Sequence, residues 1–167
     1  MIAPVQAFRL PAYEEIPEVG LYLEQTIKYI NRYLAPFLEM ALTASMVSNY
    51  VKKGVIPGPV KKQYGRDQIA SLLFVAVAKV AMSMEDIAQM FGIQAQTYSY
   101  AVAYTYFRSE LENVLHYVFG LKDSLDYVGK ESTQAKTLLR NLIIAVAHKL
   151  YLEQYLSILK AQNRDQS

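Results

Sequence analysis

The 167-residue chain contains no cysteine and no tryptophan, and it has only two histidines. Without cysteine, a disulfide scaffold, a thiolate nucleophile and thiolate-ligated zinc or iron–sulfur centres are excluded. The seven glycines and six prolines leave long stretches between them, and such spacing leaves little room for an all-β fold. The lack of cysteine also suits a reducing compartment, and we expect a cytoplasmic protein.

Long hydrophobic runs are missing as well. A membrane-spanning helix needs about 20 consecutive apolar residues, whereas the best run, residues 69–80, is interrupted by Ser71 and Lys79. The first residues do not show a basic segment followed by an apolar one, so we expect no signal peptide and no membrane partner. Apolar residues make up 53% of the chain and charged residues 19%, which predicts a folded chain. We expect part of this apolar surface to be buried between two copies, in a homodimer.

Motifs that would support catalysis are absent from the sequence. It has no glycine-rich phosphate loop, no metalloprotease-type histidine pair and no Gly-x-Ser-x-Gly turn. Glu112 and His116 are spaced to share one face of a helix, but a surface pair is the simpler interpretation than half of a metal site. His148 lies in an apolar segment, where we expect a buried structural imidazole. We therefore expect no enzyme activity, no metal and no cofactor.

One short stretch carries charge of only one sign. Residues 40–66 contain five basic side chains and no acidic one, whereas the rest of the chain has 12 basic and 15 acidic residues. The five basic residues are Lys52, Lys53, Lys61, Lys62 and Arg66. A local cationic patch of this kind attracts polyanions, most commonly a phosphate backbone, although a solvated basic loop has the same composition.

Hydrophobic periodicity and turn residues predict an all-α fold with a minimal β-wing. Prolines at positions 4, 11 and 17 predict an extended N-terminal arm over residues 1–18. Helices are expected over residues 19–34, 43–53, 66–82, 83–92, 94–119 and 133–159. Thr43, Ser83 and either Ser132 or Thr133 are the expected N-caps. Pro57, Gly58 and Pro59 predict the turn of a short β-ribbon.

This pattern divides the chain into four parts. After the arm, residues 19–92 form a helix-turn-helix region with a wing, residues 93–163 form C-terminal helices for dimerisation and sensing, and residues 164–167 form a tail. The last helix is apolar nearly all round at its centre, which predicts burial on all sides, partly by a second chain.

The expected helix at residues 43–53 carries a polar stripe beside the wing. Ser45, Ser48, Asn49 and Lys52 recur at steps of three and four, so they share one face. Such side chains can contact base edges in a DNA groove. A second group of side chains, close to this stripe, would contact the DNA phosphates. These residues are Lys53, Lys61, Lys62, Tyr64 and Arg66. An ordinary solvent-facing polar stripe is the alternative for the helix alone.

The stretch from Leu42 to Pro57 resembles the recognition helix and following turn of MerR-type regulators. A capping Thr43 precedes the helix, which ends in Lys53-Gly54-Val55-Ile56, and the family's tyrosine after the wing matches Tyr64. The segment Ser83-Met84-Glu85-Asp86-Ile87 matches the start of a later helix in that family. Together with residues 10–17 and 21–25, the layout looks closest to a bacterial domain-of-unknown-function family with a MerR-like winged helix-turn-helix.

This resemblance implies a transcriptional regulator that binds double-stranded DNA as a homodimer. A clustered set of tyrosines, Tyr98, Tyr100, Tyr104 and Tyr106, is a candidate pocket for a small-molecule effector, although core aromatics at an interface rim would show the same pattern. The alternative function is a protein-interaction or small-ligand-binding helical module that keeps the winged scaffold without binding DNA.

Overall fold

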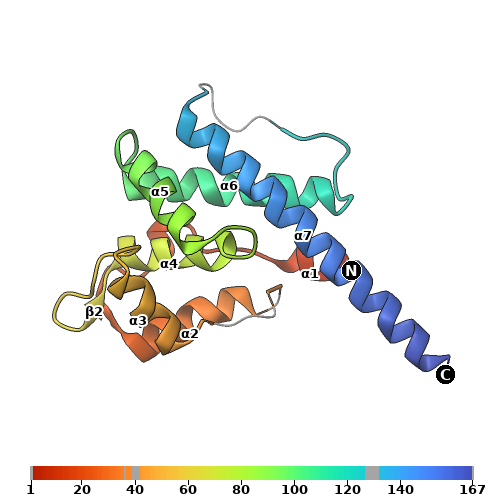
Figure 1. The fold of residues 1–167 in the computed structure, drawn as a ribbon, viewed down its shortest axis with the longest axis horizontal. Coiled ribbons are helices and arrows are strands. Elements are labelled where there is room, and N and C mark those ends of the chain that lie inside the picture. The colour runs from red at the N-terminus through yellow and green to blue at the C-terminus, as the bar shows by residue number, and fades with distance from the viewer. Residues whose placement is uncertain (1, 36, 39–41, 127–131, 167) are drawn as a thin grey trace.

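The computed structural model describes residues 2–35, 37–38, 42–126 and 132–166. Over these residues the chain is mostly helical, as the sequence predicts (Figure 1). It has one two-stranded antiparallel sheet, whose strands are not the two halves of the ribbon predicted around Pro57, Gly58 and Pro59. The elements in chain order are α1 (Ile2–Ala7), a 3-10 turn η1 (Tyr13–Glu15), β1 (Leu21–Tyr22), α2 (Leu23–Leu34), α3 (Ala44–Lys52), β2 (Gln63–Tyr64), α4 (Arg66–Ala78), α5 (Met84–Ala95), α6 (Tyr100–Val118) and α7 (Gln134–Asp165).

The expected N-caps are observed. The side-chain oxygens of Thr43, Ser83 and Thr133 each accept a hydrogen bond from the backbone N–H three residues on, at 3.2, 3.2 and 3.3 Å. Each bond satisfies one of the free N–H groups at a helix start, so the boundary is set locally by the sequence.

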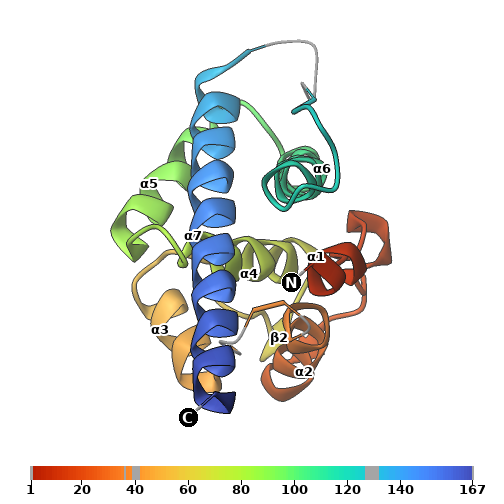
Figure 2. The same ribbon diagram turned by 90° about the vertical axis from the view of Figure 1, so that its right-hand side faces the viewer.

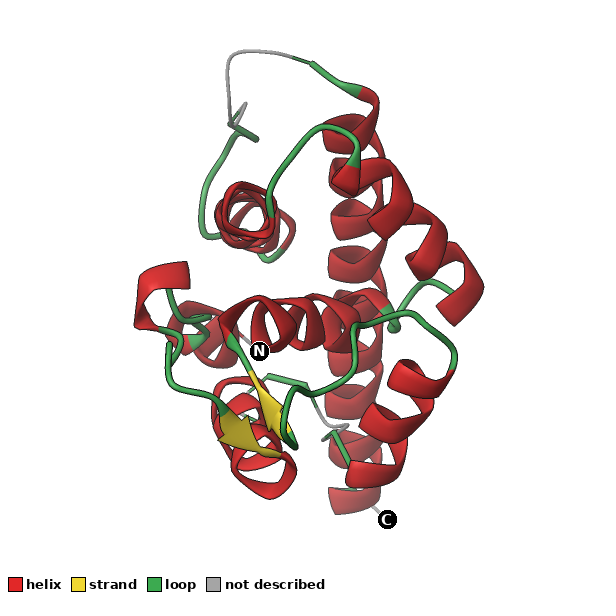
Figure 3. Cartoon of the chain, turned by 90° about the vertical axis from the view of Figure 1, so that its left-hand side faces the viewer, coloured by secondary structure: helices red, strands yellow, loops and turns green. Residues whose placement is uncertain are grey.

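Several predicted boundaries were wrong. Residues 2–7 form helix α1 rather than extended arm, because Pro4 lies in the first turn, where no backbone N–H is needed. Gly92 does not end α5, which continues to Ala95. The helix expected from residue 94 begins at Tyr100, where Ser99 caps it. Residues 21–22 form a strand instead of helix and pair with residues 63–64 (Figure 3).

Helix α4 is the centre of the core. Nine of its 13 residues are buried, and it packs against α2, α6 and α7. In Figure 2, α4 lies behind α7, with α6 above it and α2 below. One cluster of buried apolar side chains runs from Val5 to Leu150, so the two regions predicted on either side of residue 92 share a core.

Residues 8–18, which we call the N-terminal strap, are held by helices far along the chain. The Tyr104 hydroxyl donates to the carbonyl of Pro11 at 2.6 Å, and Arg108 Nε donates to the carbonyl of Leu10 at 2.8 Å. Phe8, Leu10 and Ile16 are buried. The strap therefore joins the first residues to α6 by both polar and apolar contacts.

Helix α7 has 32 residues, and only about its first half is packed on the core. Its buried residues end at Leu150, and the remaining part projects beyond the rest of the chain (Figure 1). Five large apolar side chains on this projecting half are 39–58% exposed, namely Leu152, Tyr155, Leu156, Ile158 and Leu159. The burial on all sides predicted for the centre of the helix is not reached within one chain either, because Leu138, Asn141 and Ala145 are exposed.

The same helix is long and apolar enough to cross a membrane, although it contains no uninterrupted apolar run of that length. Among the described helices α7 alone meets this test of length and composition, with an 18-residue window of mean hydropathy 1.3 of which 28% is buried. Helices in the core of a water-soluble protein pass this test as well, and α7 contributes Leu142, Ile143 and Val146 to the core.

Candidate functional site

The polar stripe predicted on residues 43–53 is exposed. Ser45, Ser48, Asn49 and Lys52 all face solvent on α3. The opposite face is packed, with Val47 completely buried. Because the stripe follows steps of three and four residues, its side chains form one ridge along the helix. Hydroxyl, amide and ammonium groups are thus presented together on the surface.

Two local devices set the position of α3. The Asn31 side chain of α2 bonds both backbone groups of Leu42, donating to its carbonyl at 3.0 Å and accepting from its N–H at 2.8 Å. At the other end Gly54, with φ 72°, allows the Val55 N–H to reach the Tyr50 carbonyl at 2.9 Å. This pattern is a Schellman cap, which ends the helix and turns the chain toward the wing.

The wing is a tight hairpin with two lysines at its tip. Val60 and Gln63 exchange both backbone hydrogen bonds at 3.0 Å, so Lys61 and Lys62 form a two-residue loop. The predicted turn at Pro57, Gly58 and Pro59 was therefore wrong, because the turn of the hairpin lies two residues after Pro59. Both lysines have positive φ, 51° and 64°, as a type I′ turn requires. Non-glycine residues rarely adopt this conformation, and asparagine–glycine is the usual sequence at such a turn.

The hairpin is held close to α3 and α4. The Gln68 side-chain amide donates to the carbonyls of Pro57 and Gly58, and its oxygen accepts from the Gly65 N–H at 2.7 Å. A Cβ on Gly58 would lie 3.4 Å from the Val51 side chain of α3. The wing therefore lies beside the C-terminal end of the exposed ridge (Figure 1).

The lysines around the ridge have no partner within the described part of the chain. The side chains of Lys52, Lys53, Lys61 and Lys62 are exposed, and none takes part in an ion pair or hydrogen bond with another described residue. Four uncompensated positive charges thus occur on α3 and the adjacent wing. We call the polar ridge and these lysines the basic saddle.

Two residues expected to contact phosphate have other roles. Tyr64 is buried against the core. Arg66 Nε donates to the Ile16 carbonyl at 2.8 Å, and its guanidinium carbon lies 5.3 Å from the centre of the Tyr13 ring. Burial of Tyr64 removes its side chain from the surface, so the phosphate contact predicted for it was wrong. Arg66 is engaged by the strap, whose return to this point the sequence could not show. Lys53, Lys61 and Lys62 are the members of the predicted group that keep exposed cationic side chains.

A second site is a cavity between α4, α5, α6 and α7. It has a volume of about 180 Å³. All four tyrosines of the candidate pocket, Tyr98, Tyr100, Tyr104 and Tyr106, line it, together with Phe74, Phe91, Phe107 and Lys136. The clustering of these tyrosines at one cavity is therefore observed, whereas occupation by a ligand stays a prediction.

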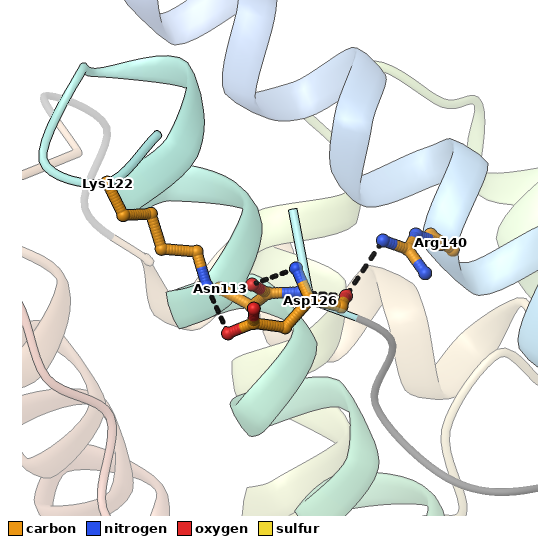
Figure 4. Close-up of polar contacts among 4 residues, drawn as sticks. All are labelled: Asn113, Lys122, Asp126 and Arg140. Carbon is orange, nitrogen blue, oxygen red and sulfur yellow. Dashed lines mark hydrogen bonds and ion pairs between the residues drawn. The ribbon is translucent and has the colours of Figure 1, made fainter. Parts of the chain in front are cut away.

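A polar network fastens the segment after α6 to α6 and α7 (Figure 4). The Asn113 side chain donates to the Asp126 carbonyl at 2.7 Å and accepts from its N–H at 3.2 Å. Arg140 also donates to this carbonyl, at 2.9 Å, and Lys122 pairs with the Asp126 carboxylate at 2.6 Å. These contacts hold Asp126 in place on the described side of the connection between the two helices.

A completely buried carboxylate lies next to this network. Glu110 has no exposed surface, and its Oε1 lies 3.0 Å from Arg140 Nε in an ion pair. Neither carboxylate oxygen has a well-aligned hydrogen bond to a described residue. Burial raises the pKa of Glu110 above its ordinary 4.5, although the Arg140 charge acts in the opposite direction. No local pattern in the chain indicates this pair, because its burial depends on the packing of α7 against α6.

The histidines do not form a site with acidic residues. Glu112 pairs with Arg9 at 3.8 Å, and no group of three potential metal ligands occurs among the residues the structure describes. His148 faces solvent, so its expected place in the core was wrong. It lies on a face of α7 that the single chain leaves uncovered.

Comparison with protein families places most of this architecture in one group. The model of the domain of unknown function DUF1836 matches residues 11–107, more than half of the chain, and the protein belongs to this family. The match includes residues 11–18 of the strap, the basic saddle and the beginning of α6. No curated protein and no solved structure matches the chain.

Proposed function

We propose that the protein binds double-stranded DNA through a winged helix-turn-helix and regulates transcription. The observation that carries this proposal is the basic saddle, in which an exposed polar helix face lies beside a hairpin tipped by two unpaired lysines. The order of elements supports it, since a strand, two helices, a hairpin and a third helix follow one another from β1 to α4. In such folds the second helix enters the major groove.

The two halves of the saddle would have different tasks. Ser45, Ser48, Asn49 and Lys52 would contact base edges, where an asparagine side chain can pair with adenine and a lysine with guanine. Lys53, Lys61 and Lys62 would contact phosphates and set the orientation on the duplex. The positive φ of both hairpin lysines supports this role, because conformational cost of this kind accumulates at functional positions.

The active form in this proposal is a homodimer. The projecting half of α7 supports it, since five large apolar side chains there lack cover within one chain. A second copy can cover them by packing its own α7 alongside, and helix pairing through such a stripe is common in regulators. Two saddles related by two-fold symmetry would then read a pseudo-palindromic site. We place this activity in the cytoplasm.

Selection from genomic DNA fragments by the purified full-length protein tests the proposal. Enrichment of a pseudo-palindromic sequence is expected, and its affinity should fall with salt. With three phosphate-contacting lysines per subunit, the slope of log affinity against log salt should be roughly −5 for a dimer, at about −0.9 per phosphate. Failure to enrich any sequence, or affinity independent of salt, would contradict the proposal.

Substitutions separate the two parts of the saddle. Lys61→Ala should weaken binding to all sequences alike and reduce the salt slope, whereas Asn49→Ala should change the preference among sequences. Ser109→Ala, at an exposed position of α6 outside both the saddle and the projecting half of α7, is the control and should leave binding unchanged. Equal, sequence-independent losses for both saddle variants would mean that α3 is not the reading helix.

A further inference from the structure

We infer that the cavity between α4, α5, α6 and α7 binds a small uncharged aromatic compound, one ring in size. This activity goes beyond DNA binding and does not require it. Three properties of the cavity support the inference: its volume, the aromatic rings in its wall, and the hydrogen bonds within the chain that already engage polar side chains of the wall.

The volume matches one ring. At about 180 Å³ the cavity is slightly larger than an engineered apolar cavity of about 150 Å³ that binds benzene. A bicyclic compound with side groups needs the larger volumes of drug-sized sites, about 300 Å³ or more. One ring with one small substituent therefore has the dimensions that this space accepts.

The wall favours an aromatic ring over a saturated one. Phe74 of α4 lies edge-to-face with Phe91 of α5 and Phe107 of α6, with ring centres 5.3 and 5.2 Å apart and ring planes at 78° and 89°. All three line the cavity, and so does Met90. Aromatic pairs gain energy from edge-to-face contacts, and a methionine sulfur makes favourable contacts with a ring edge. A guest ring can extend this arrangement, whereas a saturated ring cannot.

Polar side chains of the wall are already hydrogen-bonded within the chain. The Tyr104 hydroxyl donates to the Pro11 carbonyl at 2.6 Å, and the Ser71 hydroxyl donates to the Asp67 carbonyl at 2.8 Å. The Gln94 side-chain amide donates to the backbone carbonyl four residues on. A ligand rich in polar groups would give up its hydrogen bonds to water for few new ones, so the wall favours a ligand that binds through apolar area.

Charge on the ligand is unfavourable as well. In the described part of the lining no residue is acidic, so a cation would find no carboxylate there. The one basic residue of the lining, Lys136, has its Nζ 5.8 and 5.3 Å from the ring centres of Tyr98 and Tyr106. An anion would have to compete with the contacts that Lys136 makes within the chain. An uncharged ring needs no contact with Lys136, because it binds by covering apolar surface.

The cavity reaches the surface, so a ligand can enter it. Val102 of α6 and Leu138 of α7 both line it, and they are 53% and 38% exposed. Phe107, which also lines it, is buried in the core. The cavity thus extends from exposed apolar surface on these two helices to the interior of the fold.

A methyl NMR titration of the full-length protein, without DNA, tests the inference. The six methionines are labelled with ¹³C at their methyl groups, and Met90→Leu identifies the Met90 signal. Benzyl alcohol is the probe, and its ring should shift the Met90 signal until the site is saturated. The signal of Met46, on α3 and outside the cavity, should stay in place.

Three analogues of about the same size define the ligand class. Cyclohexylmethanol, with a saturated ring, should bind roughly two- to ten-fold more weakly than benzyl alcohol, as expected for the loss of one aromatic pair. Benzylamine and benzoate should each bind at least about ten-fold more weakly, because their charge loses hydration in the apolar wall. Equal or tighter binding of cyclohexylmethanol would overturn the aromatic class of the ligand, and equal or tighter binding of either ion would overturn its lack of charge.

A matched pair of variants locates the site. Ala103→Leu narrows the cavity, so benzyl alcohol should bind at least about ten-fold more weakly while circular dichroism shows a folded protein. Ala101→Leu, two residues earlier on α6 and outside the cavity, should keep the wild-type affinity. Equal affinities of the two variants would overturn the inference.

The Met90 signal of the wild type tests the site independently of both variants. Absence of a saturable shift at millimolar benzyl alcohol would show that no ring enters the cavity. None of these results depends on whether the protein binds DNA.

Discussion

Replacing the hairpin lysines by the sequence usual for their turn should stabilise the protein and weaken its binding to DNA. In the double variant Lys61→Asn/Lys62→Gly, the positive φ values of 51° and 64° are kept by residues that adopt them readily. A non-glycine residue in this left-handed region costs roughly 1–2 kcal/mol of stability. The greater conformational freedom of glycine in the unfolded chain offsets roughly 0.5–1 kcal/mol of what the replacement gains. The free energy of unfolding should rise by about 1 kcal/mol, which is about 2–4 °C in melting temperature for a chain of this size.

In the proposed mode of DNA binding, the same change removes two phosphate-contacting cations per subunit. For a dimer that is four charges, and the slope of log affinity against log salt should become less steep by roughly 3 to 4. Fluorescence anisotropy with the selected DNA at several salt concentrations measures the slope, and thermal unfolding followed by circular dichroism measures the stability. An unchanged or lower melting temperature would refute the reasoning about the backbone. An unchanged salt slope would refute the reasoning about phosphate contacts.

Three further predictions concern the C-terminal helices. Because burial raises the pKa of Glu110, the folded protein holds that proton to higher pH than the unfolded chain does. The wild type should therefore lose stability relative to Glu110→Gln as the pH rises above 4.5, and urea unfolding at several pH values measures the difference. Asn113→Ala should lower the free energy of unfolding by about 2 kcal/mol, since both bonds to the Asp126 backbone are lost, whereas the exposed Ser109→Ala should have little effect. Leu156→Glu should convert the dimer to a folded monomer in sedimentation velocity, and a dimer that persists would locate the interface elsewhere.

Local chemistry determined which features could be predicted from the sequence. The caps at Thr43, Ser83 and Thr133 were correct because a hydroxyl and an N–H three residues on suffice to form them. The exposed stripe on α3 followed from helical periodicity alone. The helical class of the fold followed in the same way from spacing within segments.

Features that depend on contacts between distant segments were missed. Arg66 was assigned to phosphate, yet the structure gives its guanidinium to carbonyls of the strap, 50 residues earlier in the chain. Tyr64 is buried by packing that periodicity in a two-residue strand cannot indicate. The ion pair of Glu110 with Arg140 requires the register of α7 on α6, and no local pattern encodes that register.

The N-terminal strap also fixes an order of events during synthesis. The residues that receive it, Tyr104 and Arg108, follow their partners in the strap by 93 and 98 positions. A ribosome therefore releases Leu10 and Pro11 long before α6 emerges from the exit tunnel. Until then these residues lack their final cover, so the strap cannot complete its packing before at least 93 further residues have been synthesised.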